Sequence, residues 1–137
     1  MLKTKSIYKP KEYGDGTRIL ISRLYPRGTK KEKIDQWYKD LAPSKELIKK
    51  YKGNEITVRK FLSSYKSEIS RNPSSLELIK KIRKYSKREN VTLLCFEPDG
   101  EPCHRHVLRE IMKNEKFFHS SAMPEFTDSH LTKINSV

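Results

Sequence analysis

The chain of 137 residues has little of several features that mark whole classes of protein. Only two cysteines occur, so no disulfide framework can form, and an intracellular, reducing compartment is the default. No apolar run approaches the roughly 18 residues that a membrane-spanning helix needs. The first residues, from Met1 to Ser6, lack the apolar centre of a signal peptide. We therefore expect a cytoplasmic protein with no membrane partner.

Acidic residues are also scarce, because 17 Asp and Glu face 30 Lys and Arg, for a formal net charge of +13. A field of that sign favours anionic partners such as nucleic acid or nucleotides. The basic runs 30–33, 49–52 and 80–84 interleave with apolar positions, which is typical of the solvated face of an amphipathic helix. Charge alone therefore leaves nucleic acid as a candidate partner without an identified site.

Short apolar segments alternate with helical patterns along the chain. Strands are expected at 4–8, 17–22 and 91–96, with a short final strand at 117–119. A capping box formed by Thr29 and Glu32 predicts a helix over 29–41. Further helices are expected from Pro43 to Gly53, from a cap at Asn54 through Ile69, from Asn72 through Tyr85, and over 103–114. This order predicts the α/β class: a single three-layer domain with a mainly parallel sheet of about four strands and helices on both faces.

The most informative segment begins with the strand that ends at Cys95. A polar turn follows, and Pro102 at the first helical position would start a helix with open backbone amides. Open amides and the helix dipole attract anions, and a thiol held there tends to ionise. The first turn carries three candidate catalytic residues: Cys103 as nucleophile or thiolate contact, His104 for proton transfer, and Arg105 as a charge clamp.

Other interpretations of these residues stay open. Cys103 can be a small buried apolar residue, and Arg105 can pair with Glu101. Cys95 and Cys103 can form a redox pair, because a strand end and a helix start can bring two sulfurs together, although no C-x-x-C motif is present. The spacing from cysteine to arginine differs from that of a cysteine phosphatase loop.

A metal site is not indicated by the ligand spacing. Structural zinc sites usually have ligands paired two to four residues apart in both halves, and this chain lacks that pattern. His104 and His106, two positions apart on a helix, point to different sides. The sequence therefore predicts no metal.

The loop Arg23-Leu-Tyr-Pro-Arg27-Gly28 is a second cluster. Two arginines that flank a proline turn could clamp an oxyanion or a phosphate, or Arg23 could pair with Asp15 or Asp40. Ligands of parallel sheets gather beyond the carboxyl ends of the strands. If the strands at 17–22 and 91–96 are parallel neighbours, both arginines should converge with the helix start at 103–105.

Several motifs together resemble the domain-of-unknown-function 488 (YeaO-like) family, over about residues 4–113. They are Tyr13-Gly-Asp-Gly16, Arg18-Ile-Leu-Ile-Ser-Arg-Leu-Tyr-Pro-Arg-Gly28, Trp37-Tyr-Lys-Asp-Leu-Ala-Pro-Ser44 and Phe61-Leu-Ser-Ser-Tyr-Lys-Ser-Glu-Ile69. That family usually has Trp where this chain has Tyr25, and the Cys-His-Arg ending is similar to another branch of it. The resemblance implies an α/β fold and no established activity. It nominates as site or scaffold residues Arg23, Pro26, Arg27, Gly28, Pro43, Ser44, Tyr65 and Glu68.

Taken together, the sequence predicts one domain over 1–137, with a family-like core at about 4–113 and an extension at 114–137. The favoured function is an anion pocket for a phosphate-bearing small molecule or nucleotide. Its expected ligand-binding residues are Arg23, Arg27, Gly28, Ser44, Tyr65 and Cys95. A nucleic-acid or interaction module and a Cys95/Cys103 thiol redox protein are the alternatives. The sequence identifies neither a reaction, nor a cofactor, nor an oligomeric state.

Overall fold

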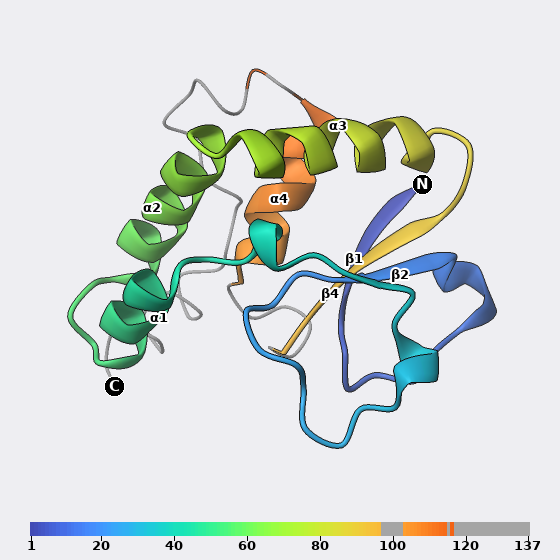
Figure 1. Cartoon of the computed structure of the whole chain (residues 1–137), viewed down its shortest axis with the longest axis horizontal. Coiled ribbons are helices and arrows are strands. Elements are labelled where there is room, and N and C mark those ends of the chain that lie inside the picture. The colour runs from blue at the N-terminus through green and yellow to red at the C-terminus, as the bar shows by residue number, and fades with distance from the viewer. Residues whose placement is uncertain (97–102, 115, 117–137) are drawn as a thin grey trace.

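The computed structural model of the protein describes residues 1–96, 103–114 and 116 (Figure 1). The turn at 97–102 with Pro102, the expected strand at 117–119 and the C-terminal segment lie outside the described residues.

A parallel sheet of four strands organises the chain. Its strands are β1 (Leu2–Ser6), β2 (Thr17–Leu20), β3 (Gln36–Trp37) and β4 (Val91–Cys95). They lie in the order β1-β4-β2-β3, and every neighbouring pair is parallel. All five residues of β4 are buried, because this central strand is covered on both faces. The predicted α/β class with a parallel sheet is confirmed.

Four α-helices lie on one side of the sheet, and of these α3 and α4 contact its strands. They are α1 (Lys45–Lys52), α2 (Val58–Ser70), α3 (Pro73–Ser86) and α4 (His104–Lys113). Helix α4 contacts β1 and β4 and also α2 and α3, so it lies between the sheet and the outer helices (Figure 1). The main core joins Ile19 and Leu93 of the sheet to Leu62, Ile79 and Leu108 of the helices. No described helix is long and apolar enough to cross a membrane.

The opposite face is covered by short 3₁₀ helices instead of α-helices. Arg18 of β2 is fully buried there; it bonds to Asp15 of η1 (Tyr13–Asp15) and, through Nε, to the carbonyl of Lys33 in η2 (Lys31–Lys33) at 2.6 Å. Lys5 Nζ lies 3.1 Å from the same carboxylate. A buried carboxylate therefore compensates two buried cations, which keeps their burial tolerable.

The predicted helix over 29–41 is wrong. This stretch contains η2, the two-residue strand β3 and η3 (Lys39–Leu41). Pairing with the sheet prevails over the local capping signal, because the amides of Asp35 and Tyr38 donate to the carbonyls of Arg18 and Leu20 at 2.8 and 2.9 Å.

The predicted start of the next helix is close to the observed one, because Ser44 caps α1 through a bond from the Leu47 amide. The expected cap at Asn54 is wrong. Thr57 caps α2, and Asn54 adopts a positive φ of 59° in the preceding turn.

Candidate functional site

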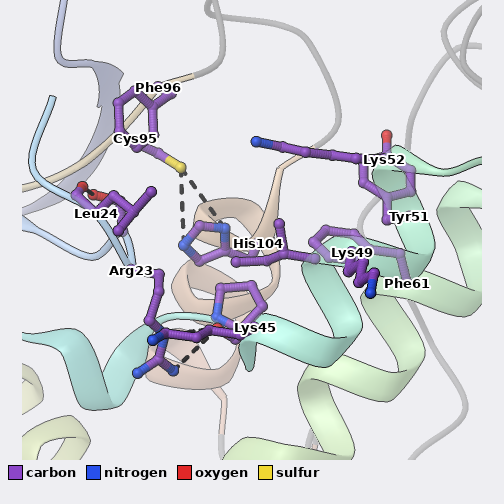
Figure 2. Close-up of a pocket in the computed structure, with 13 residues that line it drawn as sticks. Arg23, Leu24, Lys45, Lys49, Tyr51, Lys52, Phe61, Cys95, Phe96 and His104 are labelled. Carbon is purple, nitrogen blue, oxygen red and sulfur yellow. Dashed lines mark hydrogen bonds between the residues drawn. The ribbon is translucent and has the colours of Figure 1, made fainter. Parts of the chain in front are cut away.

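The carboxyl ends of β2 and β4 lie at the same edge of the sheet, as the prediction requires, while the loop 97–102 lies outside the described residues. Strands β2 and β4 are parallel neighbours, and the amide of Ile21 continues their ladder to the carbonyl of Leu94 at 3.0 Å. Beyond this edge lies a cavity of about 280 Å³, lined by Arg23 from the loop after β2 and by Cys95 at the end of β4 (Figure 2). Helix α1 forms its opposite side.

A thiol and an imidazole form one wall of this cavity. Cys95 and His104 both line it, although each is almost fully buried, at 1% and 5% exposure. Cys103 lies directly behind them: its Sγ is 2.9 Å from Cys95 Sγ and 3.5 Å from His104 Nδ1. Cys103 is not among the cavity-lining residues. The cavity therefore reaches one sulfur of a contacting pair and not the other.

Contacts on both sides of the ring fix the imidazole of His104. Its Nε2 lies 2.6 Å from the carbonyl oxygen of Ile21, which can only accept, so Nε2 carries a proton. In the neutral ring Nδ1 is then an acceptor that faces the sulfurs.

Tyr65 packs edge-on against His104, with ring centroids 5.1 Å apart, and donates its hydroxyl to the carbonyl of Leu41 at 2.7 Å. Burial raises the pKa of Tyr65 well above its usual value, so its phenol stays protonated. Tyr65 therefore orients the imidazole from behind and does not line the cavity.

Three lysines of α1 surround the opening of the cavity. Lys45, Lys49 and Lys52 follow one another at i, i+4 and i+7, which places them on one face of the helix. All three are exposed. Figure 2 shows Lys52 extending from α1 toward the side of the cavity formed by Cys95 and Phe96. An anion in the cavity would meet several ammonium groups at little cost in desolvation.

Apart from Ser22, the remaining cavity walls are largely apolar. They come from Leu24, Pro43 and Ile48 and from three aromatic rings, Tyr51, Phe61 and Phe96. Tyr51 and Phe61 stack on each other at 4.3 Å with an interplanar angle of 15°. The cavity thus offers a flat, apolar surface beside its cationic opening.

Arg23 holds the loop after β2 against the start of α1. Its Nε and Nη2 donate to the carbonyl of Pro43 at 3.2 and 3.0 Å, and Nη2 also reaches the carbonyl of Ala42 at 3.4 Å. The expected pairing of Arg23 with Asp15 or Asp40 is not observed. These partners are neutral carbonyls, so the contacts leave the charge of the Arg23 guanidinium uncompensated at the cavity.

Arg23 also lines a second cavity, of about 360 Å³. Its charged lining is mixed, because it contains Asp40 and Glu68 as well as Arg23 and Arg71. Such a mixture gives no preference for an anion, so we place the candidate site in the first cavity.

The other predicted site residues are distributed differently. Arg27 and Gly28 are exposed and line neither of these two cavities, and Arg105 is fully buried and lines neither. Ser44 is bound by Glu68, which accepts from both its amide, at 3.0 Å, and its hydroxyl. Of the residues predicted to converge, Arg23 and His104 line the cavity, whereas Arg27, Cys103 and Arg105 do not. Cys95, predicted separately as a ligand-binding residue, also lines it.

The helix start also differs from the prediction. The described helix α4 begins at His104, with Cys103 as its N-cap residue. The Cys103 side chain makes no capping bond, so its sulfur is directed to Cys95.

The lysines of α1 are the site residues that the sequence did not nominate. The run at 49–52 has the pattern of a solvated face, and only the spacing of Lys45, Lys49 and Lys52 indicates a shared side. The structure also brings the ligand atoms of Cys95, Cys103 and His104 within 4.8 Å of one another, a donor set that could hold a metal ion.

Comparisons with known proteins agree on one family. Residues 2–116 match a family model described as the active DUF488-N3 subclade. The chain is 31% identical over 115 residues to the uncharacterised protein YeaO of Escherichia coli (strain K12), covering 82% of this chain and 97% of YeaO. It is also 31% identical over 108 residues to the uncharacterised protein Rv3073c of Mycobacterium tuberculosis, covering 77% of this chain and 88% of that protein. No solved structure matches.

Proposed function

The chain belongs to the DUF488 family, and we propose that it binds a small anion with a flat apolar body in the cavity between β4 and α1. The observation that carries this proposal is the composition of one cavity. The same cavity of about 280 Å³ is lined by four cationic side chains, by aromatic and aliphatic residues, and by a thiol beside an imidazole. Ligand sites typically combine apolar walls with a few convergent polar groups in this way.

The charges favour an anion over a neutral ligand. The lining residues Arg23, Lys45, Lys49 and Lys52 carry four positive charges, and no Asp or Glu is among the described lining residues. Cations that converge on a cleft raise the local concentration of anionic ligands. A phosphate or a carboxylate would satisfy this requirement equally.

The apolar walls favour a ligand that is more than a bare anion. A planar group can pack against the stacked rings of Tyr51 and Phe61 while its charged end reaches the ammonium groups. A nucleoside monophosphate or an aromatic carboxylate has this combination, whereas inorganic phosphate lacks the apolar part. The substrate class proposed is therefore an aromatic or heterocyclic anion.

The catalytic roles predicted for Cys103, His104 and Arg105 remain predictions. Of these three, only His104 lines the cavity, and the sulfur that a bound molecule would meet first is that of Cys95. The family model is described as active without naming a reaction.

Thermal unfolding with a matched set of ligands tests the proposal. The set is adenosine monophosphate, adenosine, inorganic phosphate and benzoate. At ten times its dissociation constant a ligand stabilises the folded state by about 1.4 kcal/mol, which corresponds to about 3–5 °C in Tm for a chain of this size. We expect adenosine monophosphate to raise the Tm more than adenosine or phosphate at equal concentration.

Two lysines one residue apart provide the matched control. Lys49 lines the cavity and Lys50 does not, although both are exposed on α1. Lys49→Glu should reduce the Tm shift and Lys50→Glu should preserve it. Equal effects of the two substitutions, or no shift with any ligand of the set, would contradict the proposal.

The nucleic-acid alternative rests on the net charge of +13. The exposed residues Lys80, Lys81 and Lys84 belong to α3, which lies apart from α1 (Figure 1). Binding to RNA or DNA that falls steeply with salt indicates phosphate contacts. Such binding, lost on charge reversal of these three lysines and insensitive to Lys49→Glu, would favour a nucleic-acid module over the small-molecule site.

A further inference from the structure

We propose that Cys95 and Cys103 form a two-cysteine thiol–disulfide exchange site, in which Cys95 reacts with an incoming small disulfide and Cys103 resolves it. This activity goes beyond ligand binding, because bonds are made and broken at the two sulfurs. It is carried by the contact between the two sulfurs, by the imidazole beside them and by the difference in their access to the cavity.

The two sulfurs are held together by the fold. Cys95 ends β4, where its carbonyl accepts from the Ile7 amide at 2.8 Å, and Cys103 is the N-cap residue of α4. Their Sγ atoms lie 2.9 Å apart. A disulfide needs about 2.05 Å, so an approach of roughly 0.9 Å would join them. Side-chain rotation can supply a movement of this size without separating the sheet from the helix.

His104 is placed to take a thiol proton. Its Nε2–H is bound to the Ile21 carbonyl, which leaves Nδ1 as the acceptor, 3.5 Å from Cys103 Sγ and 3.7 Å from Cys95 Sγ. An adjacent base is the usual means of activating a thiol for attack. The imidazole therefore serves the resolving sulfur directly.

Access separates the roles of the two cysteines. Cys95 lines the cavity, while Cys103 does not. The surrounding ammonium groups stabilise a thiolate at Cys95 and attract a negatively charged reagent. A small disulfide that carries carboxylates fits both the charge of the cavity and the chemistry of the sulfur.

The exchange balances as two displacements. The Cys95 thiolate attacks one sulfur of a disulfide RSSR; the Cys95–SR bond forms and RS⁻ leaves. Cys103, after its proton passes to Nδ1 of His104, attacks Cys95 Sγ; the intramolecular disulfide forms and a second RS⁻ leaves. The protein loses two electrons, RSSR gains them, and the two thiol protons end on the two RS⁻ groups as RSH.

A metal is the competing occupant of the same donor set. In a tetrahedral zinc site, Zn–S bonds of about 2.3 Å would hold the two sulfurs about 3.8 Å apart. The observed distance between the two Sγ atoms is shorter, at 2.9 Å. Cys95 Sγ also lies 3.7 Å from Nδ1 and 3.8 Å from Nε2 of His104. It is therefore not aligned with the Nδ1 lone pair, where a metal shared by all three groups would sit. This geometry favours disulfide exchange over metal binding.

The test is reaction of the full-length protein with dithiobis(nitrobenzoate), an aromatic, doubly negative disulfide that releases a coloured thiolate. The wild type should release two thiolates for each chain and retain none, because the second release closes the Cys95–Cys103 disulfide. Intact mass should show a chain lighter by two hydrogens. Cys103→Ala should release one thiolate and keep the other as an adduct.

Cys95→Ala should react at least tenfold more slowly than Cys103→Ala, because Cys103 is shielded. A neutral disulfide, dithiodipyridine, separates this proposal from the anion site. If Lys49→Glu abolishes the preference for the anionic reagent over the neutral one but the Cys95–Cys103 disulfide still forms, only the anion site is affected. A wild type that keeps two adducts, or remains unoxidised, would overturn the proposal. So would thiols that become reactive only after a chelator removes bound zinc. The number of thiolates released and the intact mass are both measured on the wild type, so they test the proposal even if a variant fails to fold.

Discussion

Replacement of Ser44 by alanine tests whether this residue is part of the scaffold or a ligand contact. The Ser44 hydroxyl accepts from the Leu47 amide at 3.2 Å as the N-cap of α1, and it donates to the Glu68 carboxylate. An N-cap contributes about 1 kcal/mol, and a hydrogen bond to a charged group about 1.5–3 kcal/mol, with the lower end expected where water can replace it. Because Glu68 is half-buried, Ser44→Ala should cost about 2–3 kcal/mol of unfolding free energy.

Thr57 is the matched control for this substitution. It caps α2 in the same way, through a 3.1 Å bond from the Lys60 amide. Thr57→Ala should therefore cost only about 1 kcal/mol. Urea unfolding followed by circular dichroism gives both values, and a double-mutant cycle with Glu68→Gln isolates the second bond. The cycle should show a coupling of about 1 kcal/mol or more.

The opposite result would refute this reasoning. If Ser44→Ala costs no more than Thr57→Ala and does not couple to Glu68→Gln, the hydroxyl is not held by the carboxylate. Ser44 would then be available to a ligand, as the sequence predicted.

Two further predictions concern the buried charges and the glycines. Asp15→Asn should cost about 3–5 kcal/mol in urea unfolding, because it leaves the buried Arg18 without its charge partner. Burial opposes ionisation of Asp15, but the Glu12 amide, Lys5 and Arg18 outweigh this effect and hold the pKa of Asp15 below the usual 3.8. The ionised carboxylate therefore makes its full contribution to the unfolding free energy above pH 3.8. This contribution is lost as the pH falls through the lower pKa of the folded state. The wild type should show this acid-side loss and Asp15→Asn should lack it; equal pH profiles would contradict the prediction. Gly16→Ala should destabilise far more than Gly28→Ala, since both have a positive φ but a Cβ at Gly16 would lie 2.0 Å from the Asn90 carbonyl oxygen and one at Gly28 would meet open space. Gly28→Ala should cost about 1–2 kcal/mol, and similar urea midpoints for the two variants would refute the described turn.

The parallel sheet and the edge that carries the cavity were predictable from the sequence. The sequence shows strand-like segments before Arg23 and at Cys95, separated by helices. This pattern was enough to place the carboxyl ends of both strands at one edge. The segment 29–41 was not predictable in this way, because its capping signal is local. Its amides pair with β2, a contact between segments that only the folded chain reveals.

The composition of the site was predicted in part. Arg105 follows His104 by one position, a turn of about 100° on the helix, and this rotation takes it out of the cavity. Conversely, Lys49 and Lys52 have the pattern of solvated residues, and their role depends on α1 lying opposite β4. Sequence spacing could give the face of α1 but not its neighbour across the cavity.

The central claim is that a small anion binds at the carboxyl edge of the sheet, and amide chemical shifts report this location most directly. A ¹H–¹⁵N correlation spectrum should be recorded while adenosine monophosphate is added. We predict the largest shifts at 22–24, 48–52, 95–96 and 104, with α3 unchanged. Shifts confined to Pro73–Ser86, or spread evenly over the basic surface, would contradict the claim.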